Sequence, residues 1–268
     1  MNFYLSGLYF LPLLIGGILL IAPAAISRII VILSSILLSA LALYVFIHVN
    51  EPLYFTVPHY VNEIVAGADI LMLLYFGWVA IQKKSWLVGV MSIVQLAGLL
   101  YLLKNLPAGE SMPFMVDKLS TFMFLLINII SGIIAIFTLR YIEEENCSAF
   151  RKKFFLALLF FFIGAMNLVV SADNLEYFFL FFELTTLASF LFIGFRKDEV
   201  SVKNALTALW MNQVGGIAIL AAIFFIAYNG YGEITFSNLL AHANAEGILL
   251  PLALLSIAAL IKGRSEER

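Results

Sequence analysis

The side chains that could do chemistry in this sequence lie inside long apolar stretches. Glu183 stands near the centre of the segment 174–195, among Phe, Leu and Thr residues. An acidic residue at the centre of a membrane helix costs about 2.5–3.5 kcal/mol on insertion scales, so it needs a polar environment. Helical spacing puts Glu176, Glu183 and Thr186 on one side of the segment, which predicts a stripe facing protein or water. We interpret Glu183 as a proton-relay carboxylate; a protonated Glu bonded to a neighbouring helix is the structural alternative.

The next apolar segment, 205–228, carries further embedded polar groups. Lys203 precedes it, Asn212 and Gln213 lie within it, and a glycine pair follows at 215–216. Asn and Gln commonly hydrogen-bond between membrane helices, and paired glycines allow close helix packing. Lys203, Asn212, Gln213 and Glu176 are therefore candidates for a polar axis, with interhelical packing as the structural alternative.

Lys262 ends the last apolar run. Residues 248–261 give only about 21 Å of helix at 1.5 Å a residue, against a hydrocarbon core of about 30 Å. A lysine at a span end is usually an anchor that extends to the membrane surface. A short span that ends in a charge is also typical of half of a broken helix. The polar tail 264–268 is expected to stay in water and to draw Lys262 towards the cytoplasmic surface.

Composition identifies an integral membrane protein. Of the 268 residues, 63% are hydrophobic and 12% are charged, and the mean hydropathy is +1.04. These values exclude an ordinary soluble enzyme and a disordered chain. The net charge of −2 argues against a nucleic-acid partner, which would leave a basic surface.

The sequence gives no indication of a bound cofactor or metal. The one cysteine, Cys147, cannot form an internal disulfide or hold a zinc or iron–sulfur centre by itself. His48, His59 and His242 lie in loops or at span ends and do not group into a metal site. There is no Gly-rich phosphate loop, so we expect neither a nucleotide nor a redox cofactor in this chain.

The expected fold is an all-α polytopic bundle of about nine transmembrane spans. The first run is interpreted as a retained helix, because no basic segment precedes it and no cleavage site follows it. The third run is expected to begin nearer Val61 than its apolar core suggests. The nine runs are 3–21, 29–47, 70–81, 86–103, 119–139, 154–172, 175–195, 205–228 and 248–261.

Basic residues predict the orientation of the bundle. They concentrate in the connections after the first, third, fifth and seventh runs, whereas the other connections hold only Lys104 and Lys118. The first group comprises Arg28, Lys83, Lys84, Arg140, Arg151, Lys152, Lys153, Arg196, Lys197 and Lys203. Because basic loops stay in the cytoplasm, the N-terminus is expected outside and the C-terminus inside, in a multi-pass protein of the cytoplasmic membrane.

Six stretches resemble a known family. They cover roughly residues 112–263 in the order and spacing of that family. The stretches are Val116–Ser120, Phe154–Phe155, Asn167–Asn174, Phe182–Phe195, Asn212–Gly216 and Ala258–Gly263. They are similar to the antiporter-like subunits of respiratory complex I (NADH-quinone oxidoreductase), and to the related Mrp-type antiporters and membrane-bound hydrogenases.

The resemblance implies roles for two residues. In the family, a Glu matching Glu183 and a Lys matching Lys262 form a charge pair used in proton translocation. Flavin, iron–sulfur or nickel–iron centres are then expected in partner subunits, and no redox catalysis in this chain. The implied domains are 1–111, four N-terminal helices, and 112–268, the first part of the proton-translocation domain.

Three departures from the family pattern stand out. Four spans precede Asp117 where the complex I relative has two, so 70–103 is expected to be inserted. Gln213 and Thr207 stand where some members carry Arg or Lys, which argues against a basic relay there. The family continues after the lysine with a second, inverted set of helices, so the sequence is expected to hold about the first half of a member. The chain alone is therefore not expected to translocate protons.

The sequence thus predicts a membrane subunit of a redox-driven proton-translocating complex, of the NADH or ferredoxin–quinone oxidoreductase or hydrogenase type. An Mrp-type cation/proton antiporter subunit is the first alternative, and a truncated, non-conducting membrane scaffold is the second. Other membrane subunits are the expected partners, with a second chain supplying the missing helices as one arrangement. Protons are the expected cargo, with Na⁺ left open.

Overall fold

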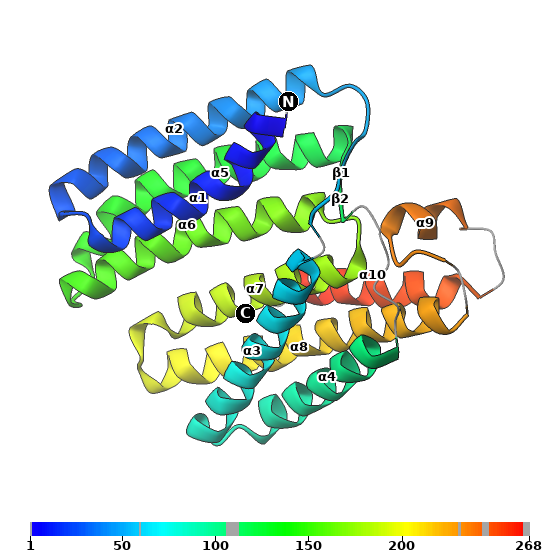
Figure 1. The fold of residues 1–268 in the computed structure, drawn as a ribbon. Coiled ribbons are helices and arrows are strands. Elements are labelled where there is room, and N and C mark those ends of the chain that lie inside the picture. Colours follow the sequence, from blue (N-terminus) through cyan, green and yellow to red (C-terminus); the bar gives the residue numbers. More distant parts are fainter. Residues whose placement is uncertain (1, 59, 106–112, 230–231, 243–246, 265–268) are drawn as a thin grey trace. The chain divides into compact units, whose positions relative to one another are not determined.

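The computed structural model describes residues 2–58, 60–105, 113–229, 232–242 and 247–264, and most of them are helical (Figure 1). The chain divides into two compact units, each assembled from two separate stretches. The first unit comprises Met1–Tyr54 and Met115–Ser171, and the second comprises Phe55–Phe114 and Ala172–Arg268.

The all-α polytopic prediction is confirmed. Among the described residues, eight helices are long and apolar enough to cross a membrane, and the shorter α10 (Leu249–Arg264) covers the ninth predicted span. The third helix begins at Tyr60, as the sequence analysis anticipated. The eight are α1 (Asn2–Ile21), α2 (Ala24–His48), α3 (Tyr60–Lys83), α4 (Trp86–Asn105), α5 (Lys118–Glu144), α6 (Ala149–Ser171), α7 (Leu175–Ile193) and α8 (Glu199–Tyr228). The orientation in the membrane stays a prediction.

Three small elements were not predicted. Strands β1 (Leu53–Phe55) and β2 (Phe114–Val116) form a two-stranded sheet, and α9 (Phe236–Ala241) is a short helix after α8. Asp173 holds the start of α9, because its Oδ1 accepts hydrogen bonds from the Ser237 backbone N at 2.9 Å and from Ser237 Oγ at 3.0 Å. Elements this short carry too few residues for a hydrophobic period to reveal them.

Glycines bring α1 and α6 of the first unit together. A Cβ on Gly16 would lie 3.0 Å from the Ala157 carbonyl oxygen, and one on Gly164 would lie 2.9 Å from Leu13 Cδ2. Lipid tails are as apolar as these side chains, so membrane helices associate through close packing of small residues rather than through burial from water. This contact joins the first helix of the chain to a segment about 140 to 150 positions later.

The embedded asparagines of the first unit hydrogen-bond between helices. Asn128 Nδ2 donates to Asn167 Oδ1 at 3.0 Å, which joins α5 to α6. Asn167 Nδ2 in turn donates to the Leu8 carbonyl oxygen of α1 at 2.9 Å. Both side chains are buried, so the bonds replace hydration that the membrane interior cannot supply.

Asp117 caps α5, which gives one of the family-like stretches a structural role. Its Oδ1 accepts hydrogen bonds from the Ser120 backbone N at 2.7 Å and from Ser120 Oγ at 2.8 Å. Asp117→Ala removes this acceptor and should lower the free energy of unfolding by about 1 kcal/mol. Asp117→Asn, which keeps an oxygen at the cap, should change it little. Thermal unfolding in detergent measures both, and equal stability of the Ala variant and the native chain would contradict the assignment.

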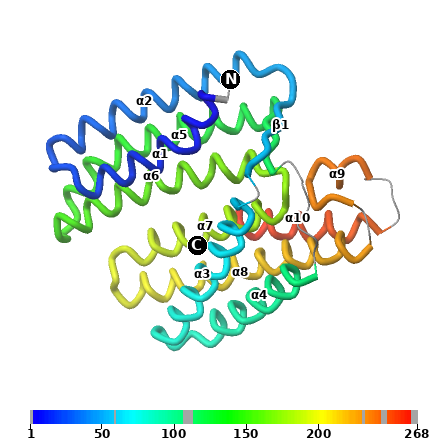
Figure 2. The backbone as a smooth tube through the Cα atoms, in the orientation of Figure 1, coloured from blue at the N-terminus to red at the C-terminus, as the bar shows by residue number. Residues whose placement is uncertain are grey.

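The second unit is built around α8. Helices α4, α7 and α10 each pack along α8, and α7 and α8 run side by side, joined through the 3₁₀ turn η1 (Gly194–Arg196) (Figure 2). Helices α3 and α4 form a hairpin, and α3 also contacts α7. The second unit therefore places the predicted inserted segment beside the helix that carries Glu183.

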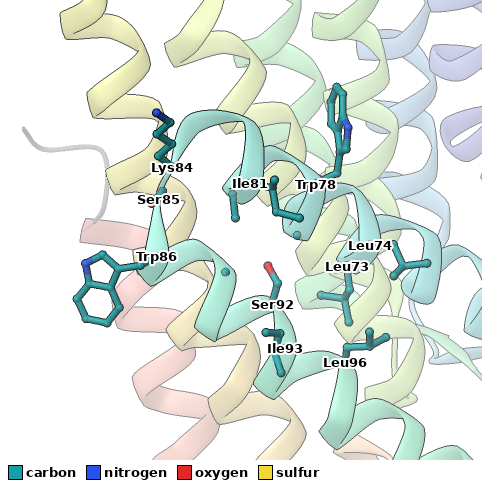
Figure 3. A pocket seen from close by; sticks show the side chains of 13 residues that line it. Leu73, Leu74, Trp78, Ile81, Lys84, Ser85, Trp86, Ser92, Ile93 and Leu96 are labelled. Carbon is teal, nitrogen blue, oxygen red and sulfur yellow. The ribbon is translucent and has the colours of Figure 1, made fainter.

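The α3–α4 hairpin encloses a groove of about 600 Å³ near its turn (Figure 3). Its walls are mostly apolar and include the indole rings of Trp78 and Trp86, and its polar lining residues are Lys84, Ser85 and Ser92. The Ser92 side chain is itself buried, and its hydroxyl accepts a hydrogen bond from Gln213 of α8. One residue of the groove wall therefore also hydrogen-bonds to α8.

Candidate functional site

Glu183 lies in the middle of α7 and is 0% exposed. Asn174 caps the helix and fixes where it begins, because its Oδ1 accepts a hydrogen bond from the Glu176 backbone N at 2.8 Å. Glu183 Oε1 accepts a hydrogen bond from Gln95 Nε2 of α4 at 2.8 Å. Within the part of the chain that the structure describes, Oε2 has no hydrogen-bond partner. One carboxyl oxygen is thus held in place and the other is available.

Gln95 of α4 bonds Glu183 directly, and Gln213 of α8 and Ser92 of α4 extend this hydrogen-bonded cluster. Gln95 Nε2 donates to the Gln213 carbonyl oxygen at 3.2 Å as well as to Glu183. Gln213 Nε2 donates to Ser92 Oγ at 2.8 Å. These side chains are fully or almost fully buried, and an amide can donate to a carboxylate without titrating. The cluster can therefore orient Glu183 in either protonation state.

The glycine pair of α8 makes room for this arrangement. A Cβ on Gly216 would overlap both Gln95 Nε2 and Glu183 Oε1, and one on Gly215 would lie 3.0 Å from Phe182 Cζ. The pair was predicted to serve close helix packing, and its surroundings agree with that prediction. The bond between Gln95 and Glu183 passes directly over Gly216, so this position has no space for a side chain.

Lys262 reaches the same helix as Glu183, one turn further along. Its Nζ donates to Thr186 Oγ1 at 3.1 Å and lies 4.6 Å from the centre of the Phe182 ring. This placement differs from the expectation that the polar tail draws the lysine to the membrane surface, because Thr186 belongs to the middle of α7. The reason is that α10 packs along α8, which directs the flexible lysine stem across Phe182. Lys262 thus contacts the side chain three residues after Glu183 on α7.

The other predicted polar-axis residues occupy different surroundings. Glu176 is half-buried in the first turn of α7. Asn212 is buried in α8, and its Oδ1 has no hydrogen-bond partner among the described residues. Lys203 is exposed near the start of α8, about 15 Å along the helix from Gln213. The structure therefore brings Gln213 to Glu183 and leaves Lys203 at the end of its helix.

Gln95, Ser92 and Asp69 were absent from the predicted site. Asp69 is 2% exposed and lies on α3, which contacts α7. A signal for Ser92 and Gln95 existed, because residues three apart share a helix face and both are polar within an apolar span. Gln95 bonds Glu183, 88 residues further along the chain, and Ser92 bonds Gln213, 121 residues further along, which no local pattern reveals.

Comparison with known proteins matches two parts of the chain to family models. Residues 172–264 match the family described as NADH:quinone oxidoreductase/Mrp antiporter, transmembrane region. Residues 108–155 match the N-terminus of chain 5 of NADH-ubiquinone oxidoreductase (complex I). The chain belongs to the complex I/Mrp antiporter family. The first of these matches includes Glu183, Gln213 and Lys262, which all come from the second unit.

Curated relatives of this family align with part of the chain. The Na(+)/H(+) antiporter subunit A1 of Staphylococcus haemolyticus (strain JCSC1435) is 31% identical over 137 residues, which cover 51% of this chain and 16% of that protein. The same subunit of Staphylococcus aureus (strain JH9) is 31% identical over 120 residues, covering 44% of this chain and 14% of that protein. The matched stretch thus spans about a sixth of the curated relatives or less.

Proposed function

We propose that the chain is a membrane subunit of an Mrp-type cation/proton antiporter assembly in which Glu183 and Lys262 carry the proton. The observation that supports this most is the setting of Glu183. A fully buried carboxyl group lies mid-span with one oxygen held by Gln95, and a lysine reaches the next turn of the same helix. Ionisable groups inside a membrane bundle usually mark ion or proton paths.

Charge coupling gives these two residues a mechanism. Burial disfavours the ionised carboxylate and the ionised lysine, whereas their mutual attraction favours both. When α10 and its lysine move away from α7, ionised Glu183 loses that stabilisation and takes up a proton. When they return, the carboxyl group releases it. A small displacement of one helix can therefore be converted into proton transfer.

A redox-driven complex of the NADH dehydrogenase or hydrogenase type is the second candidate. The family description that matches 172–264 names NADH:quinone oxidoreductase alongside the Mrp antiporter. In that setting, flavin, iron–sulfur or nickel–iron centres belong to partner subunits, and this chain performs only proton transfer. The two candidates differ in what drives the helix displacement: a cation gradient or electron transfer.

Proton movement in membrane vesicles tests the proposal and separates the candidates. Vesicles are prepared from cells that produce the chain together with its neighbouring membrane subunits. A Na⁺ gradient should change the internal pH if the assembly is an antiporter, whereas NADH, reduced ferredoxin or hydrogen should do so in a redox-driven complex. Absence of proton movement under every driving force, with the assembly intact, would support the scaffold alternative and contradict the proposal.

Lys262→Met should reduce that proton movement about tenfold or more, because the variant keeps an apolar chain over Phe182 but removes the charge paired with Glu183. Lys197→Met is the matched control: Lys197 is exposed after η1, so its loss should leave the rate unchanged. The initial rate of internal pH change measures both variants. Equal rates for Lys262→Met and the native chain would remove Lys262 from the mechanism.

A further inference from the structure

A second buried carboxyl group accompanies Glu183. Asp69 is 2% exposed in α3, and its Oδ1 has no hydrogen-bond partner among the described residues. Asp117 and Asp198, by contrast, lie at helix ends and have a capping role. They accept hydrogen bonds from backbone N–H groups at the starts of α5 and α8. Asp69 lies within a helix, where no free backbone N–H is available to it. Its burial therefore has no capping role to explain it.

A hydrogen bond anchors α3 on α7 through the same face of α3 that carries Asp69. Tyr177 Oη donates to Asn62 Oδ1, which joins the first turn of α3 to the first turn of α7. Asp69 follows Asn62 by seven residues, so both lie on the same face of α3, about 10.5 Å apart along its axis. Glu183 follows Tyr177 by six residues, about 9 Å. Asp69 therefore lies about two turns along α3 from this contact, and Glu183 lies about 1.7 turns along α7 from it.

The spacing on α7 leaves a gap that Asp69 can fill. Glu176 and Glu183 are seven residues apart, or about 10.5 Å of helix, which is too far for direct proton transfer. Glu176 is half-buried near the start of α7 and Glu183 is fully buried at its middle. Asp69 lies on the face of α3 that Asn62 joins to α7. A buried carboxyl group on this face is positioned to connect the two ends of the gap.

We infer that Asp69 is a proton-carrying carboxyl group that links Glu176 to Glu183, supplied by the α3–α4 hairpin. In the step between the two buried groups, protonated Asp69 gives its proton to the Glu183 carboxylate, directly or through one water molecule, and becomes a carboxylate; the reverse step restores it. Glu183 Oε2 and Asp69 Oδ1 are the oxygens left available by the surrounding hydrogen bonds. Gln95 holds Glu183 Oε1, and Lys262 of α10 donates to Thr186, three residues after Glu183. The transport role of this link depends on the proposed function.

Infrared spectroscopy of the full chain in lipid nanodiscs tests whether Asp69 and Glu183 shift each other's titration midpoints. Each protonated carboxyl gives a C=O stretching band, assigned by its loss in Asp69→Asn or Glu183→Gln. Two nearby carboxyls titrate as a pair, so removing either should shift the titration midpoint of the other by about one pH unit. Asp198→Asn, at an exposed helix cap, should leave both midpoints unchanged. Unshifted midpoints would overturn the inference. If Asp69→Asn fails to fold, the midpoint of Asp69 in the Glu183→Gln variant still provides the test.

Proton movement in the vesicles supplies the second readout. Asp69→Asn should slow it about tenfold or more, and Asp69→Glu should retain it, because only the second variant keeps a titratable group. If Glu183→Gln abolishes flux and Asp69→Asn does not, the inference fails and the proposed function stands. If the midpoints shift but Glu183→Gln leaves flux unchanged, the proposed function fails and the pair remains a proton-binding site without a transport role.

Discussion

Glu183→Gln should reduce proton flux through the assembled complex by about a hundredfold or more. The amide oxygen of the variant can still accept the hydrogen bond from Gln95 Nε2, so the local structure should persist. What disappears is the group that binds and releases the proton. The assembly should therefore form normally and fail in transfer, which separates a mechanistic role from a packing role.

The control for this variant is Glu199→Gln, an isosteric change at an exposed position in the first turn of α8. It should leave flux and assembly unchanged. Flux is measured as the initial rate of internal pH change, and assembly as the melting temperature of the purified chain in detergent. A native rate of flux in Glu183→Gln would show that the buried carboxyl only bonds its neighbour, which is the structural alternative raised from the sequence.

Gly216→Ala should destabilise the second unit by about 2 kcal/mol or more. Its added methyl group would overlap Gln95 Nε2 and Glu183 Oε1, and the hydrogen bond between them would have to break or move. Overpacking a helix contact costs about 1–3 kcal/mol, and an unsatisfied buried polar group costs a similar amount. Because the same bond orients Glu183, proton flux should fall together with stability.

Gly77→Ala provides the matched control, because a Cβ at Gly77 of α3 meets no heavy atom within 4 Å. It should be neutral or slightly stabilising, as Ala is the better helix former. In a Gln95→Ala background, Gly216→Ala should cost less, since one of the two overlaps is gone. Denaturant unfolding in detergent measures the four variants. Equal costs of Gly216→Ala in both backgrounds would mean that Gln95 does not limit the space at this glycine.

Much of the fold could be read from the sequence because the bilayer imposes it. A span must be apolar for about 20 residues, so each run overlaps one helix, although α2, α3, α6 and α8 begin five to ten residues before their runs do. The start of α3 near Val61 could be anticipated despite Asp69, because the apolar core alone was too short to cross. The strands and α9 could not, since their stability comes from contacts such as Asp173 with Ser237 rather than from a periodic pattern.

The site residues likewise include some that a single helix reveals and others that depend on contacts between helices. Glu183 was recognisable because a mid-span carboxylate is rare and its helix face is polar. Gln213 was a candidate with an unknown partner, and the structure gives it Ser92 and Gln95. Gln95 could not be ranked above other embedded amides, because its importance depends on which helix packs beside α4. Pairings between distant helices are tertiary information, and composition and spacing within one helix do not contain it.

The distance of 88 residues between Gln95 and Glu183 has a consequence for biosynthesis. A ribosome adds roughly 5–20 residues a second, so the α3–α4 hairpin is made on the order of 10 s before Glu183. During that interval Asp69 and Gln95 must reside in or beside the bilayer without the helix that later covers them, at a cost of about 2.5–3.5 kcal/mol for a centred acidic residue. The hairpin is thus synthesised before α7, and α7 can pack against it as soon as it is made. A ribosome stalled between α4 and α7 would leave an intermediate with its acidic and amide groups uncovered, a natural target for membrane quality control.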